Sequence, residues 1–95
     1  MPHPLVVHCK KARYDVYIGR SRAGNVWGNP FSHLPGSLAE FKVAYDEVLP
    51  RYEAWLRAQP QLVERARMEL RGKRLGCWCA PKPCHGDILA RIANE

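Results

Sequence analysis

Apolar residues repeat at strand spacing near the start of the chain and at helical spacing in its second half. Residues 5–9 form a mostly apolar run, and residues 14–19 alternate and are rich in β-forming types, so both segments are predicted to be strands. Residues 10–13, the basic link between them, lack a diagnostic turn dipeptide, although the two strands could pair as a hairpin. A third strand is expected over residues 74–79, another short apolar run.

Residues 38–56 carry apolar side chains at helical spacing. Ser37 and the glutamate three residues later have the form of a capping box at the start of this helix. Pro50 falls inside the pattern and is predicted to kink the helix or split it in two, because it lacks an N–H and crowds the preceding turn. A further helix is expected to begin at Pro60 and to end at Gly72.

A long irregular stretch, residues 20–36, separates the first two strands from the helices. A last helix is expected from Cys84 or His85 to Ala93. Together these elements predict a single α/β domain over residues 1–95. A small sheet of about three or more strands would be covered by three to four helices, in the order β-β-loop-α-α-β-α.

The chain has 95 residues, of which 46% are hydrophobic and 25% charged, a balance typical of one globular domain. Its net charge of +6 favours a small anionic or nucleotide-like ligand, or nucleic acid, although a solvated basic surface is the plainer alternative. No apolar run could span a membrane and the start lacks the pattern of a signal peptide, so we expect a cytoplasmic protein. Four cysteines in a reducing compartment are expected to be metal ligands, nucleophiles or buried thiols.

A cysteine-rich run ends the third strand and opens the last helix. Strand alternation would place Cys77 and Cys79 on one face. Cys84 would lie at the helix N-terminus, where free N–H groups and partial positive charge lower the pKa of a thiol. Lys82 and His85 would add to this field, so Cys84 is the best candidate for a reactive thiolate.

One interpretation of the run is a metal site. Cys77, Cys79 and Cys84, with His85 or Cys9, have the ligand types of a zinc site, and three thiolates would also suit an iron–sulfur cluster. The spacing is not that of the common C-x2-C knuckle. Adjacent helical residues also diverge by about 100°, so Cys84 and His85 would fit one ion poorly.

A second interpretation is catalytic, with Cys84 as nucleophile, His85 as base and Asp87 as an orienting or acidic group. A third is structural, because free cysteines are among the most buried residue types. The thiols would then be small apolar groups, and the turn would be an anion-binding or structural corner.

A second candidate region is the loop that follows the second strand. Arg20 and Lys82 are suited to binding a phosphate, and Trp27 could stack on a base or sugar. Asn29, which follows Gly28, could form hydrogen bonds with both donors and acceptors of a ligand. The alternative is a packed loop in which Trp27 fills the core and Asn29 caps backbone groups.

Three motifs together resemble the bacterial and phage family called domain of unknown function 4326. They are Gly-Asn-Pro-Phe at 28–31, Cys-Trp-Cys at 77–79 and Cys-His-Gly-Asp at 84–87, and the likeness extends from about residue 6 to residue 93. The resemblance implies which positions belong to the family's motifs. It implies no activity.

The leading hypothesis is a small enzyme or sensor in which the loop 28–31 and the turn 77–87 converge on one pocket for a nucleotide-like or phosphorylated ligand. The alternative is a zinc-stabilised or structural-cysteine binding module without catalysis, contacting nucleic acid through its basic face. A plain interaction domain, such as a phage accessory protein, is a third hypothesis.

Overall fold

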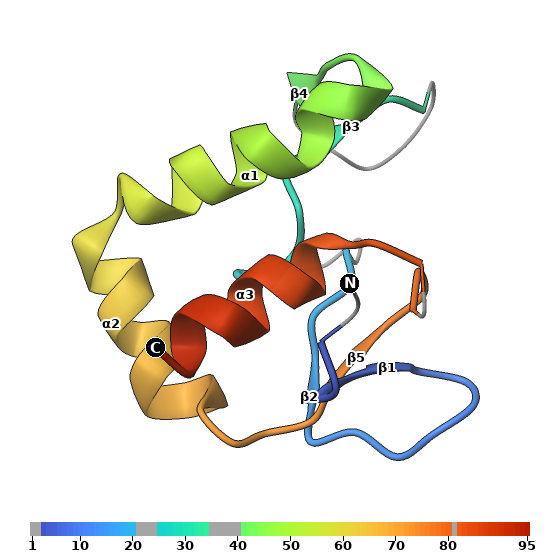
Figure 1. The fold of residues 1–95 in the computed structure, drawn as a ribbon, viewed down its shortest axis with the longest axis vertical. Helices are drawn as coiled ribbons and strands as arrows, with labels where there is room; N and C mark the ends of the chain where they lie inside the picture. The colour runs from blue at the N-terminus through green and yellow to red at the C-terminus, as the bar shows by residue number, and fades with distance from the viewer. Residues whose placement is uncertain (1–2, 21–24, 35–40, 81) are drawn as a thin grey trace.

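The structure is a computed structural model that describes residues 3–20, 25–34, 41–80 and 82–95 (Figure 1). Its five short strands lie in two small sheets, and three α-helices and one 3-10 helix complete the described part of the chain. The predicted α/β class is therefore confirmed. None of the helices in the described ranges has the length and apolar character needed to cross a membrane.

The main sheet has three parallel strands in the order β1-β5-β2. They are β1 (Val6–His8), β2 (Val16–Tyr17) and β5 (Leu75–Cys77). All three residues of β5 are buried, because this strand takes the centre of the sheet and hydrogen-bonds on both sides. The hairpin considered for the first two strands is wrong, because both run parallel to β5 and are separated by it.

A second sheet pairs β3 (Phe31–Ser32) with β4 (Phe41–Lys42), again in parallel. The prediction of helix at residues 41–44 is wrong, because the N–H groups of Phe41 and Val43 bind carbonyls of the 30–32 segment instead. The rings of Phe31 and Phe41 stack with centroids 5.3 Å apart. The capping box expected at residues 37–40 lies outside the described residues.

The helical region begins with the 3-10 helix η1 (Tyr45–Glu47), which leads directly into α1 (Val48–Arg57). Pro50 therefore lies in the first turn of α1 and does not kink the middle of a longer helix. The first N–H groups of a helix have no intrahelical partner, so a proline loses little there.

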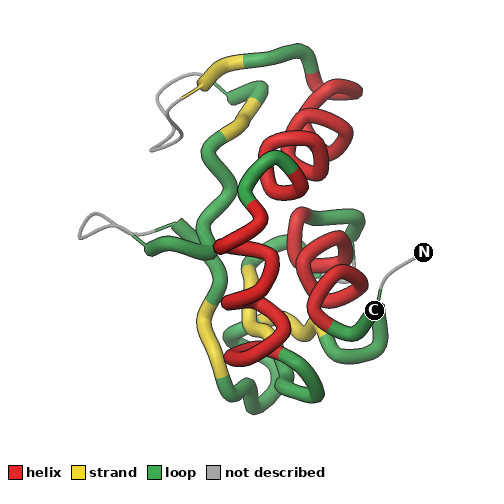
Figure 2. The backbone as a smooth tube through the Cα atoms, turned by 90° about the vertical axis from the view of Figure 1, so that its left-hand side faces the viewer, coloured by secondary structure: helices red, strands yellow, loops and turns green. Residues whose placement is uncertain are grey.

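Two more helices follow, α2 (Pro60–Leu70) and α3 (His85–Ala93). Pro60 is the first residue of α2, as predicted. Gly72 lies just beyond the end of α2, where its φ of 73° terminates the helix. Helix α3 packs on α1, α2 and the main sheet, and Figure 1 shows it between α2 and the strands of that sheet; Figure 2 shows the same helices from the left-hand side of that view. Its Ile88, Leu89 and Ile92 are buried in the core, as the sequence predicted.

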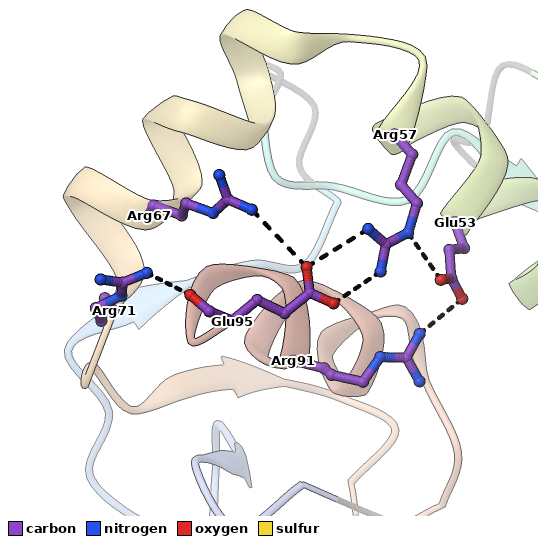
Figure 3. Close-up of polar contacts among 6 residues, drawn as sticks. All are labelled: Glu53, Arg57, Arg67, Arg71, Arg91 and Glu95. Carbon is purple, nitrogen blue, oxygen red and sulfur yellow. Dashed lines mark hydrogen bonds and ion pairs between the residues drawn. The ribbon is translucent and has the colours of Figure 1, made fainter.

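Exposed ion pairs join the three helices on the outside (Figure 3). Arg57 of α1 binds Glu53 at 3.0 Å and Glu95 at 2.9 Å, and Arg91 of α3 binds Glu53 at 2.7 Å. Solvent and salt screen such exposed pairs, so each contributes little to stability. Burial of the apolar face of α3 is therefore the main force that holds the helices on the sheet.

Candidate functional site

The two motif segments meet at one cleft of about 1260 Å³. Asn29 and Phe31 line it from the loop, and Cys77, Cys79 and Cys84 line it from the end of β5 and the start of α3. The convergence expected from the sequence is therefore confirmed. It follows from the parallel sheet, because β2 and β5 end at the same edge and the segments that follow them therefore begin on the same side.

Three polar residues are buried in the described part of the chain: Asn29, Ser32 and His85. All three line the cleft. A buried polar group is costly unless it is hydrogen-bonded, so their grouping around one cavity marks this region as the polar centre of an otherwise apolar core. Ser32 was not predicted, because no local pattern distinguishes it from other loop serines.

Side-chain amides fix the loop to the end of β2. Asn25 Nδ2 donates to the carbonyls of Tyr17 and Gly19, both at 2.9 Å. Asn29 Oδ1 accepts from the N–H of Phe31 at 2.9 Å, an Asx turn that points its backbone into β3. The amide nitrogen of Asn29 makes no hydrogen bond with the described residues, and the residue lines the cleft.

Arg20 lies between the loop and the cleft. Its guanidinium donates to the carbonyls of Asn29, at 3.0 Å, and Phe31, at 3.4 Å, while the residue also lines the cleft. Lys11 and Lys82 are exposed at the same cleft. Three cations from separate segments therefore surround the buried polar residues.

Two predicted ligand-binding residues, Trp27 and Gly28, are not among the described residues that line the cleft. Trp27 is 4% exposed and belongs to the core, with the Arg65 guanidinium 5.5 Å from its ring centroid. A side chain on Gly28 would lie 3.2 Å from the carbonyl oxygen of Asn25. Trp27 therefore packs as the alternative expected, with its ring in the core, where burial of a large apolar surface is favourable; its role in ligand binding stays a prediction.

Trp78, which the sequence places only in a motif, is the tryptophan that faces the cleft. It is 55% exposed, and its Nε1 donates to the hydroxyl of Tyr17 at 2.8 Å. The His8 ring meets it edge-on at 5.7 Å. These two contacts fix the orientation of an exposed aromatic plane.

Strand β5 ends at Cys77, which is buried against Cys84 with the two Sγ atoms 3.2 Å apart. Cys79 lies beyond the strand and is exposed. The expectation that Cys77 and Cys79 lie on one face of the same strand is therefore wrong, because the strand ends at Cys77 and its side-chain alternation does not extend to Cys79. Cys77 contacts Cys84, and all three thiols line the cleft.

The thiol pKa values differ from the expectation that Cys84 ionises first. Hydrogen bonds with Cys77 and Cys79, together with burial, raise the pKa of Cys84 well above its ordinary value. A hydrogen bond with Cys84, followed by the charges of Arg20 and Lys82, lowers the pKa of Cys79 to about 6. The exposed Cys79 is thus the favoured thiolate, although Cys84 occupies the helix N-terminus. A catalytic role for Cys84 stays a prediction.

No three His, Cys, Asp or Glu side chains within the described ranges are placed to hold a metal ion. Cys77 and Cys84 are close enough to share one, but His85 is engaged elsewhere and Cys9 does not line the cleft. Zinc binding by Cys77, Cys79 and Cys84 stays a prediction.

His85 and Asp87 both hold backbone groups. The Nε2 of His85 lies 2.8 Å from the carbonyl oxygen of Ile18, and burial lowers the pKa of His85 to about 4, so the ring is neutral at pH 7 and donates this bond. Asp87 accepts from the N–H groups of Cys84 and His3, at 3.1 and 2.9 Å. Their predicted roles as base and acid are untested, and their visible contacts are structural.

Comparisons with known proteins agree with the motifs. A family profile described as "Domain of unknown function (DUF4326)" matches residues 7–95. The chain is 40% identical over 91 residues to the "Uncharacterized 12.4 kDa protein in nrdA-td intergenic region" of Enterobacteria phage T4, covering 95% of this chain and 77% of that protein. No solved structure gives a significant match. The chain therefore belongs to the family Domain of unknown function (DUF4326).

Proposed function

We propose that the cleft binds a small phosphorylated ligand that carries a flat ring, such as a nucleotide. The observation that carries this proposal is the coincidence of three features on one cavity: the buried polar residues Asn29 and Ser32, the surrounding cations, and the exposed plane of Trp78. Small-molecule sites typically combine an apolar cavity with a few converging polar groups.

The anionic part of the ligand binds at Arg20, Lys11 and Lys82. Arg20 is held by the loop carbonyls, so its charge is fixed beside the cleft before a ligand arrives. The two lysines are exposed and adjust to the position of the phosphate. Asp46 is the one acidic residue among the described lining residues, so positive charge prevails.

The ring of the ligand stacks on Trp78. Stacking of a base on an aromatic side chain contributes about 1–3 kcal/mol and needs an accessible, oriented plane. Trp78 is exposed and its indole is held by Tyr17 and His8, and because Lys10 Nζ lies over one face of the ring, 5.6 Å from its centroid, the ligand stacks on the other face. The Asn29 amide nitrogen is the polar group that would read the edge of the ring or a sugar hydroxyl.

Calorimetric titration tests the proposal. The probes are the four ribonucleoside monophosphates, the matching uncharged nucleosides and inorganic phosphate. At least one nucleotide should bind more tightly than its nucleoside and than phosphate. Absence of saturable binding by every nucleotide at millimolar concentration would overturn the proposal.

Variants then separate the two halves of the site. Trp78→Ala should weaken nucleotide binding by about 5- to 150-fold, the equivalent of 1–3 kcal/mol, and leave phosphate binding unchanged. Lys82→Gln should weaken both, whereas Lys73→Gln removes an equal charge from an exposed lysine outside the described cleft lining and should change neither. Asn29→Asp keeps the acceptor for the Phe31 N–H, removes the amide donor and adds a negative charge to the cleft, so it should weaken binding of a phosphorylated ligand.

A further inference from the structure

The three thiols at the cleft point to a chemical activity that is independent of the proposed ligand. We infer that Cys77, Cys79 and Cys84 form a thiol–disulfide exchange site whose co-reactant is a small disulfide, such as oxidised glutathione. The site would alternate between three free thiols and a Cys77–Cys84 disulfide with Cys79 free.

The geometry of Cys77 and Cys84 carries the inference. Their Sγ atoms are 3.2 Å apart, inside van der Waals contact, and a disulfide needs about 2.05 Å, so an approach of roughly 1 Å closes the bond. Neither residue lies inside a regular helix: Cys77 ends β5, and Cys84 has the extended φ and ψ of −150° and 169° of a helix cap. Cys84 therefore lies outside the body of α3, so an approach of this size leaves the interior hydrogen bonds of the helix in place.

The three thiols differ in their exposure to solvent, and this difference assigns their roles. Cys77 and Cys84 are buried, whereas Cys79 is exposed, and all three line the cleft. An external disulfide therefore reaches Cys79 first. Cys84 contacts Cys77 and lines the cleft together with Cys79, so it is the sulfur that passes oxidation from the exposed thiol to the buried pair.

The exchange proceeds in three displacements. The Cys79 thiolate attacks one sulfur of the external disulfide, which releases one thiol and leaves a mixed disulfide on Cys79. Cys84 loses its proton and attacks the Cys79 sulfur, which releases the second thiol. Cys77 loses its proton and attacks Cys84, which restores the Cys79 thiolate. In sum, two protein thiols give two electrons and two protons to one external disulfide, which becomes two thiols.

The test uses the full chain, reduced and then freed of reductant. Incubation with excess oxidised glutathione, followed by acid quenching and peptide mass mapping, should show a link between Cys77 and Cys84. Cys84→Ser should stop the reaction at a glutathione adduct on Cys79. Cys79→Ser should slow oxidation of the remaining pair by about tenfold or more, because the accessible thiol is missing. The matched control Cys9→Ser, at a partly exposed thiol outside the described cleft lining, should react like the unaltered chain.

Three results would overturn the inference. They are an unchanged thiol content in the folded chain, a Cys79→Ser variant that oxidises as fast as the unaltered protein, and a stoichiometric zinc ion that the thiols hold and that blocks oxidation until a chelator removes it. The last result would favour the metal interpretation instead. Nucleotide binding is measured separately, so failure of one proposal leaves the other standing.

Discussion

Asp87 Oδ2 accepts a hydrogen bond from the backbone N–H of Cys84 at 3.1 Å, which ties the third residue of α3 to the residue that caps the helix. Cys84 completes the cap, because its Sγ accepts from the N–H of Gly86 at 3.3 Å. The other Asp87 oxygen accepts from the N–H of His3. The same carboxylate thus anchors a helix start and the described beginning of the chain, which is a structural use of a family motif.

Replacement of Asp87 by Asn should lower the free energy of unfolding by about 1 kcal/mol, the typical value of a helix N-terminal side-chain cap. The amide nitrogen would face a backbone N–H where the carboxylate now offers an acceptor to each. Urea unfolding measures the effect. Asp46→Asn, which removes the same charge from an exposed residue, should leave stability within error; equal stability of both variants would contradict the capping role.

Acidification should destabilise the protein through His85. Burial holds its pKa at about 4 in the folded chain, against 6.5 for an unperturbed histidine. Between these values the unfolded chain binds more protons, so this stability is complete above pH 6.5 and is lost as the pH falls towards 4. The loss reaches about 3 kcal/mol at 1.4 kcal/mol per pKa unit.

Urea unfolding at a series of pH values between 7 and 4 measures this slope. His85→Gln keeps a side-chain amide donor for the Ile18 carbonyl and removes the titrating group. The variant should therefore show a shallower dependence on pH. An equally steep slope in the variant would show that other groups cause it.

Substitution of Trp27 should cost far more stability than substitution of Trp78. Trp27→Ala removes a buried ring from the core and should cost about 3–5 kcal/mol of stability. Trp78→Ala removes a half-exposed ring and should cost much less, while it abolishes the stacking part of ligand binding. Thermal or urea unfolding distinguishes them; comparable destabilisation by the two variants would mean that Trp78 is a core residue.

Replacing Pro50 should change the stability very little, whereas introducing a proline one turn later should reduce it. Pro50→Ala changes a residue of the first turn of α1, so stability should move by less than about 1 kcal/mol. Ala54→Pro introduces the ring in the helix interior and should cost about 3 kcal/mol or more. Circular dichroism during unfolding checks both. A large loss with Pro50→Ala would contradict its place in the first turn.

Local sequence patterns predicted which segments form helices and strands better than they predicted which segments pair with one another. The apolar spacing identified α2, α3 and β5, and Pro60 and Gly72 marked the limits of α2 correctly. The helical pattern before η1 failed, because Phe41 pairs with Phe31 across a small sheet instead of joining α1. Spacing reports what one segment can form, and it does not report a distant segment that offers competing hydrogen bonds.

The sequence by itself determined the α/β class, the ends of the later helices and the two motif segments that would meet. These follow from local properties: side-chain period, the fixed φ of proline and the freedom of glycine. Only the tertiary structure decided that β5 lies between β1 and β2, that Trp78 and not Trp27 faces the cleft, and that Cys84 meets Cys77. Those facts depend on contacts between residues far apart in the chain, because burial of the whole core selects one face of each segment.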